Sequence, residues 1–222
     1  MTPLLAVAKL STDRVLPWPG SRPYVATGDA DDDGGITPVD ITYDDRPSRA
    51  DLTANAGDVV LARMAQTSKV FEVDARLATY VYSTGFAILR IDPAVTDPRF
   101  VAHWLRSDAL QRAKDRYSTG ATQRAITNAG LAQLQIPDLA LGEQRRIADI
   151  LDGASALRAN ARRTRAAFDD LPRALFLEGF GGAPATAAIE SLALATRTGP
   201  FGSQQLQRSR IEPGAQIGRA HV

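Results

Sequence analysis

The densest run of ligand-type side chains in the sequence is acidic, DADDDGGITPVD at residues 29–40. Asp stands at positions 1, 3, 5 and 12 of this twelve-residue stretch and Gly at position 6, which is close to the calcium loop of an EF-hand. An EF-hand loop ends in Glu and leads into a helix, whereas Asp40 ends this stretch and Pro38 falls where the helix would begin. A turn between two strands also explains this run of Asp and Gly residues. We favour the turn and keep a calcium-binding module as an alternative.

Side chains suited to catalysis are few and scattered. The two histidines, His103 and His221, stand apart, and His103 beside Trp104 fits a packed helix residue better than a proton-transfer group. The glycine-rich segment GFGG at 179–182 follows a helical pattern rather than a strand, which favours a helix C-cap and hinge over a nucleotide loop. The chain contains no Cys, so thiolate metal sites and disulfides are excluded. We therefore expect a non-enzymatic protein without a metal or a cofactor.

The loop STGATQRAI at residues 118–126 indicates a different chemistry. Its small hydroxyl residues, Gln123 and Arg124 offer several hydrogen-bonding groups with little bulk, which suits close approach to phosphates and base edges. The segment 99–124 carries six Arg and Lys residues against two Asp, a net charge of +4 in a chain whose total is only +1. This local excess favours an anionic partner such as DNA phosphate. A solvated helix face and a plain Gly turn remain the alternative explanations.

Short strands and helices are expected to position this loop. Runs rich in β-branched and aromatic residues predict closely spaced strands of an antiparallel or mixed sheet, at residues 58–64, 69–73, 79–83 and 86–91. Three helix starts follow, each predicted by a capping residue: Asp97 before Pro98, then Ser107, then Thr127. The predicted fold class of the first 140 residues is therefore α+β, with short mixed strands and a few helices.

A long helix follows this domain. Apolar or small residues recur at steps of three and four through four heptads, which is typical of a helix that pairs with another helix. The residues expected to carry helix pairing are Ile147, Ile150, Leu151, Leu157 and Phe168. Pro172 is expected to end or kink this coiled-coil helix near its last turn.

The composition is that of a globular protein, with 44% hydrophobic and 23% charged residues. No window approaches the roughly 18 consecutive apolar residues that a membrane span needs. The first residues lack the basic segment of a signal peptide. We therefore expect a soluble, cytoplasmic protein without a membrane partner.

Three segments, in this order, resemble the specificity subunit of type I restriction-modification systems. They are YSTGFAILRIDPAVTDPRFVAHWL at 82–105, LQIPDLALGEQRRIADILDGASAL at 134–157, and TGPFGS at 198–203, with a G-x-T loop (GAT, 120–122) and Ile126 between the first two. Within the second segment, LALGEQRRIADILD is similar to the family's junction between a recognition domain and a spacer helix. TGPFGS is similar to the start of the family's second recognition domain.

The resemblance implies a plan of two target recognition domains and two spacer helices, which pack antiparallel and set the spacing between the halves of a bipartite DNA site. By this comparison, residues 1–140 form one target recognition domain and 141–178 one spacer helix. Residues 179–210 are then a linker and the start of a truncated second recognition domain. The tail at 211–222 contains IGRAHV, which matches a reading frame of a common sequencing adapter, so we expect a non-native tail.

The function implied is sequence-specific binding of double-stranded DNA beside methyltransferase (M) and restriction (R) subunits, with no catalysis by the chain itself. The loop residues expected at the DNA are Thr119, Gly120, Thr122, Gln123 and Arg124, with phosphate contacts from Arg63, Lys69 and Arg116. Because the partner helix is missing, the long helix is expected to pair with a second spacer helix or with a second copy in a homodimer. The alternative is a coiled-coil assembly module without DNA contact.

Overall fold

The computed structural model describes residues 1–32 and 34–180. The chain divides into two compact units, residues 1–163 and 164–222, and only 164–180 of the second unit lie in the described part. The expected linker, second-domain start and tail at 181–222 therefore lie outside the described residues. Within the described residues, no helix is long and apolar enough to cross a bilayer.

The first sheet of unit 1 contains four antiparallel strands in the order β2-β9-β6-β7. They are β2 (Ala8–Leu10), β9 (Phe86–Ile91), β6 (Val59–Ala62) and β7 (Val70–Glu72). Strand β6 is buried at all four positions because both of its faces are covered. Its residues alternate between two clusters, so that Val59 and Leu61 face the helices and Val60 faces the second sheet.

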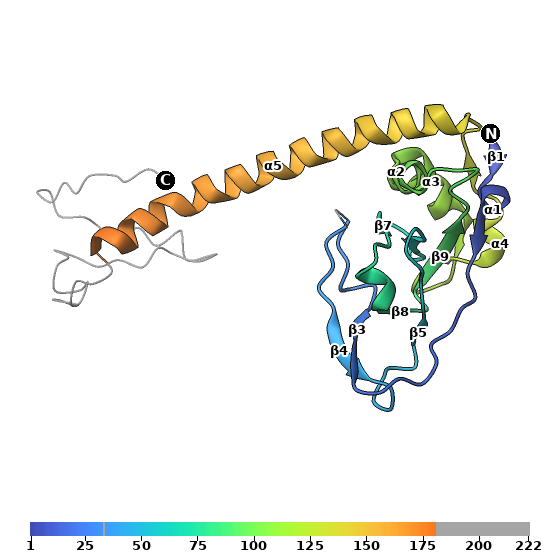
Figure 1. The fold of residues 1–222 in the computed structure, drawn as a ribbon, viewed down its shortest axis with the longest axis horizontal. Helices are drawn as coiled ribbons and strands as arrows, with labels where there is room; N and C mark the ends of the chain where they lie inside the picture. Colours follow the sequence, from blue (N-terminus) through green and yellow to red (C-terminus); the bar gives the residue numbers. More distant parts are fainter. Residues whose placement is uncertain (33, 181–222) are drawn as a thin grey trace, which may run out of the picture. The chain divides into compact units, whose positions relative to one another are not determined.

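The second sheet is mixed, with the strand order β4-β3-β8-β5. Its strands are β4 (Val39–Thr42), β3 (Ser21–Val25), β8 (Val81–Ser83) and β5 (Ala50–Leu52), and β3 pairs in parallel with β8. A one-turn helix, η1 (Leu77–Thr79), leads into β8. Figure 1 shows this sheet at the end of unit 1 away from α2 and α3. The predicted strands at 58–64, 69–73 and 79–83 are present in shortened form, and the strand at 86–91 is present over its full predicted range.

Three helices of unit 1 begin at the capping residues predicted from the sequence. The side chain of Asp97 accepts from the backbone N–H groups of Arg99 and Phe100, and that of Ser107 accepts from Leu110 N. The side chain of Thr127 accepts from Gly130 N. The helices are α1 (Leu4–Val7), α2 (Pro98–Arg106), α3 (Asp108–Tyr117) and α4 (Asn128–Leu131), and two short strands also pair, β1 (Thr2–Pro3) with β12 (Gln135–Ile136).

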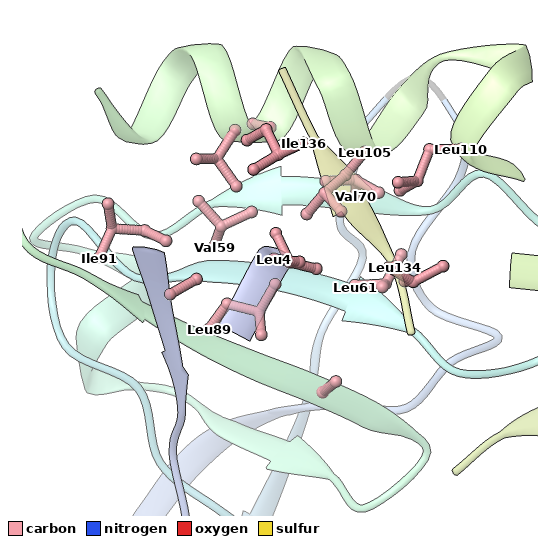
Figure 2. Packing of buried hydrophobic residues seen from close by; sticks show 14 of the residues in the cluster. Leu4, Val59, Leu61, Val70, Leu89, Ile91, Leu105, Leu110, Leu134 and Ile136 are labelled. Carbon is pink, nitrogen blue, oxygen red and sulfur yellow. The ribbon is translucent and has the colours of Figure 1, made fainter. Parts of the chain in front are cut away.

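The main core lies between the first sheet and the helices (Figure 2). Leucines from separate segments meet there, and they are Leu4, Leu61, Leu89, Leu105, Leu110 and Leu134. A second cluster, which includes Tyr82 and Phe86, fills the space between the two sheets. The layered α+β architecture expected from the sequence is therefore present, and it presents its loops on a rigid support.

The long helix α5 spans Leu141–Phe180. Pro172 lies inside it, so of the two expectations for this residue, a helix end or a kink, the helix end is wrong. Proline removes one intrahelical hydrogen bond, which costs about 3 kcal/mol in a helix interior, but the good helix formers that follow it in ALFLE continue the helix. The helix also includes Gly179, which the sequence assigned to a linker.

Candidate nucleic-acid interface

The 118–126 loop is a short hairpin that follows α3 directly. Strand β10 (Ser118–Thr119) pairs antiparallel with β11 (Ala125–Ile126), which leaves residues 120–124 as the exposed tip. Gly120 has a φ of 124°, and a Cβ at this position would overlap the carbonyl group of Gln123. The tight tip therefore requires glycine. All five loop residues predicted to meet DNA are exposed: Thr119, Gly120, Thr122, Gln123 and Arg124.

The turn between β6 and β7, residues 63–69, lies against this loop. The backbone N–H of Ala65 donates to Arg124 O at 2.9 Å, and Ile126 N donates to Arg63 O at 2.8 Å. Met64 and Ala125 form an antiparallel bridge between these two bonds. Two segments that are about 60 residues apart in sequence thus share one small ladder, and the structure brings Arg63 to the base of the loop.

Arg63 is half-buried and donates to backbone carbonyls. Its Nε lies 3.0 Å from Phe86 O and its Nη1 lies 3.2 Å from Ile126 O. Burial lowers the pKa of its guanidinium. No carboxylate of the described residues pairs with Arg63, so its charge is not neutralised within the part of the chain described.

The Asp-rich loop, residues 27–36, holds the other end of the 63–69 turn. Lys69 Nζ donates to Thr27 O at 2.8 Å, and the backbone N–H of Ser68 donates to Asp32 Oδ1 at 2.8 Å. Asp29 accepts from Ala26 N, which closes a turn between β3 and β4. Strand β4 follows this loop where an EF-hand would place a helix. The strand-connecting turn favoured by the sequence is therefore present.

Lys114 is a buried cation that the sequence analysis did not single out. Its side chain is fully buried, and its Nζ donates to the carbonyls of Ala62, Met64 (2.9 Å) and Thr67. Burial lowers the pKa of this ammonium to about 8. The four-residue step from buried Leu110 places Lys114 on the inner face of α3, which is the one sequence signal for its role.

Asp115 completes the link between α3 and the turn. Its Oδ1 accepts from the backbone N–H of Gln66 at 2.9 Å, and Gln66 has the uncommon φ of 60°. Arg124 Nη2 folds back onto the end of α3 and donates to Asp115 O at 2.7 Å and to Ser118 O at 3.0 Å. Arg116 is exposed on α3 and makes no hydrogen bond or ion pair within the described residues. The loop, the turn and α3 therefore form one interlocked unit.

Five cations of unit 1 share two features. Each donates hydrogen bonds to backbone carbonyls, and none pairs with a carboxylate of the described residues. These carbonyl-bound cations are Arg63, Lys69, Arg106, Lys114 and Arg124. A carbonyl satisfies a donor without cancelling its charge, whereas a carboxylate does both. Arg63 and Arg124, which lie at the 118–126 loop, therefore keep a positive charge that attracts anions.

The first turns of α5 dock on the domain through a charged network within unit 1. Arg99 Nη1 lies 2.8 Å from Asp149 and 3.1 Å from Asp152, and His103 Nε2 lies 2.7 Å from Asp152 Oδ1. The backbone N–H of buried Asp97 donates to Gln144 Oε1 at 3.0 Å. His103 is thus a partly buried helix residue engaged with Asp152, in line with the packed role expected for it.

Four of the five residues predicted to pair helices are exposed on α5. The exposed fractions are 57% for Ile150, 39% for Leu151, 70% for Leu157 and 66% for Phe168. Ile147 differs, because it packs against the core of the domain together with fully buried Ala148. Ile147 thus packs on the domain, and pairing through all five residues remains a prediction.

The family model of the type I restriction modification DNA specificity domain matches residues 8–164. The chain belongs to this family. Two solved structures are similar to it with a TM-score of 0.64 and 26% identity, each over 84% of this chain and 50% of the other chain. One is the HsdS subunit from Thermoanaerobacter tengcongensis, and the other concerns complex assembly and conformational transition of the type I R-M system. The chain thus spans half the length of these relatives, and no curated protein sequence matches it.

Proposed function

We propose that this chain recognises a DNA sequence with the 118–126 loop, as one recognition half of a type I specificity subunit. The observation that carries the proposal is the exposed loop tip with the carbonyl-bound cations Arg63 and Arg124 beside it. Exposed hydroxyl, amide and guanidinium groups suit hydrogen bonds to base edges and phosphates, and the surrounding positive charge suits the DNA backbone. Membership in the specificity-domain family supports the same reading.

The positioning of other subunits is the second part of the proposal. The chain would catalyse nothing itself and would place methyltransferase and restriction subunits on DNA. A solved neighbour from a study of type I R-M complex assembly supports this part. The lack of a catalytic constellation in the sequence is consistent with it.

The exposed apolar side chains of α5 favour assembly as the accompanying role. Leu157 and Phe168 are exposed by 70% and 66%, which is costly for large apolar side chains unless a partner covers them. A second spacer helix or a second copy of this chain would supply that cover. In a homodimer, two identical recognition domains would read a palindrome.

Selection from a random-sequence duplex library tests the DNA-reading part directly. The purified chain, with and without methyltransferase subunits, is incubated with the library, and bound duplexes are sequenced. We expect enrichment of one short half-site, or of its palindrome if the chain dimerises. Recovered duplexes that stay as random as the input, even with methyltransferase subunits present, would favour the assembly module without DNA contact.

A matched pair of variants locates the reading residues. We expect the double change Thr122→Ala and Gln123→Ala to abolish enrichment while thermal stability stays unchanged, because both side chains are exposed. Gln133→Ala, an exposed glutamine outside the loop, serves as the control and should retain the enriched motif. Enrichment of the same motif by the double variant would exclude these two residues from base reading.

A further inference from the structure

A small pocket opens at the base of the 118–126 loop. Its volume is about 110 Å³, and Leu52, Phe86 and Ile88 contribute its apolar lining. A single water needs only about 10–15 Å³ by the same measure, so a phosphate group has room here. The polar lining comes from separate segments, namely Ser11 and Thr12 after β2, Arg63, Thr84 before β9, and Asn128 at the start of α4.

Arg63 gives the pocket its charge. The guanidinium uses Nε and one Nη1 hydrogen to reach the carbonyls of Phe86 and Ile126, and its remaining N–H groups have no recorded partner in the described part of the chain. A half-buried cation without a carboxylate is costly, because burial removes water from the charge. The lowered pKa of this guanidinium reflects the same desolvation. The missing counter-charge is an observation independent of the pocket's shape.

The remaining polar side chains suit an anion as well. Thr12, Thr84 and Asn128 line the pocket, and no hydrogen bond within the described residues engages their side chains. Arg14, which also lines the pocket, pairs with Asp51 at 3.0 Å. No Asp or Glu lines the pocket itself. Hydroxyl, amide and guanidinium donors thus converge on a space without a lining carboxylate.

We propose that this pocket is a phosphate seat, in which Arg63, Thr12, Thr84 and Asn128 hold one phosphate group of the DNA backbone. The proposal rests on the proposed function, since it gives the DNA strand a fixed point beside the reading loop. Asn128 follows the loop closely in sequence, and Arg63 is bonded to Ile126 at the loop's end. A backbone phosphate held here would set the register of the loop tip along the bases, as phosphate contacts do in other protein–DNA interfaces.

Asn128→Asp is the decisive variant. The change is nearly isosteric, Asn128 is exposed, and an acidic residue is favourable in the first turn of a helix, so the fold should be kept. The new carboxylate lines the pocket and repels phosphate. Asn160→Asp makes the same charge change on exposed α5 and serves as the matched control.

Binding is measured by fluorescence anisotropy against a mixed-sequence duplex and against the duplex selected above, over a salt series. We expect Asn128→Asp to weaken the affinity for both duplexes by roughly tenfold or more and to reduce the slope of affinity against salt by about one unit. Asn160→Asp should change the affinity and the slope only by the small general effect of one added negative charge. Equal affinity of the two variants for the duplexes would contradict the proposed phosphate seat. Wild-type chain that binds the duplexes without sequence preference would instead contradict the proposed reading function and leave the seat standing.

A second arm distinguishes DNA phosphate from free phosphate. The side-chain amide resonances of Asn128 are assigned by comparison with Asn128→Asp and followed by NMR during titration with the duplex and with inorganic phosphate. A shift with the duplex at much lower concentration supports the backbone seat. An equal response to inorganic phosphate at equal concentration would overturn a DNA-directed seat in favour of a small-anion site, and no response to either would overturn the seat altogether.

Discussion

The ammonium nitrogen of Lys114 lies 2.9 Å from the carbonyl oxygen of Met64, although the two residues are 50 positions apart in the sequence. The same nitrogen donates to Ala62 at the end of β6 and to Thr67, so its three N–H groups are satisfied by carbonyls of β6 and of the turn that follows it. This cation therefore fixes the 63–69 turn on α3 while it keeps its charge under the 118–126 loop.

The buried ammonium predicts a specific pH dependence of stability. Burial lowers the pKa of Lys114 to about 8 from an ordinary value of 10.5, against the weaker opposing attraction of Asp115 and Asp32. The unfolded chain then binds the proton more tightly than the folded chain between pH 8 and 10.5, so this group's contribution to the free energy of unfolding rises with pH in that window. The rise is up to about 3 kcal/mol at about 1.4 kcal/mol per pKa unit.

Chemical denaturation at several pH values, for wild type and for Lys114→Met, isolates this contribution. The difference between the two free energies of unfolding should shift in favour of wild type as pH rises from 8 to 10.5. A difference independent of pH across this range would show that Lys114 titrates normally. An NMR titration of the Lys114 side chain provides a second readout.

Much of the fold was predictable because local chemistry determines it. Asp97 and Ser107 cap their helices through their own side chains, and the dense β-branched residues of β6 and β9 mark strands covered on both faces. Lys114 could not be assigned in the same way, because its partners are backbone carbonyls of a distant turn. The local sequence around a lysine does not indicate which backbone carbonyls will lie near its ammonium group after folding.

The candidate site was predictable in part for the same reason. The hydroxyl, Gly and Gln content of 118–126 identified an exposed loop, and Gly120 does occupy a backbone conformation that favours glycine. The pocket around Arg63 was hidden, because its lining comes from five separate segments joined only by folding. Pro172 does not end α5, although proline is unfavourable in a helix interior, because the residues after it continue the helix.

Arg124→Ala is expected to weaken DNA binding and to flatten the salt slope by about one unit if this side chain meets a phosphate. The same change removes the bonds of Arg124 to Asp115 O and Ser118 O, so some loss of loop order should accompany it. Arg124→Lys, which keeps the charge, should retain most of the salt dependence. An unchanged slope in Arg124→Ala would remove this residue from the phosphate contacts.

Gly120→Ala is expected to disturb the loop tip and impair sequence preference. The new Cβ would overlap the carbonyl of Gln123, and a φ of 124° is unfavourable for alanine. The core lies elsewhere, so the far-UV circular dichroism should be unchanged. Gly142→Ala, where a Cβ meets nothing within 4 Å, is the matched control and should leave selection of the half-site intact. Equal half-site enrichment by both variants would contradict a rigid loop tip.

Asp152→Asn is expected to loosen the docking of α5 on the domain. The change weakens the contacts of Asp152 with Arg99 and His103, which join the helix to α2. Because these ion pairs are partly exposed, the loss of global stability should be about 1 kcal/mol or less. Amide hydrogen exchange should nevertheless become faster across residues 144–152. Asp169→Asn, on the exposed part of α5, is the control, and equal exchange in both variants would show that the network does not hold the helix.

Pairing of the long helix predicts that the chain associates through its exposed apolar side chains. Leu157→Gln combined with Phe168→Gln should shift sedimentation equilibrium toward monomer, because each substitution removes apolar area from the seam that the heptad pattern defines. Leu177→Gln changes an exposed leucine that is not among the five residues predicted to pair helices and should leave association unchanged. If the wild-type chain is strictly monomeric, the homodimer is excluded, and the seam must then be covered by a separate spacer helix. A peptide carrying such a helix should then bind the wild-type chain but not the double variant. Equal affinity of the peptide for both chains would exclude the seam as the pairing surface.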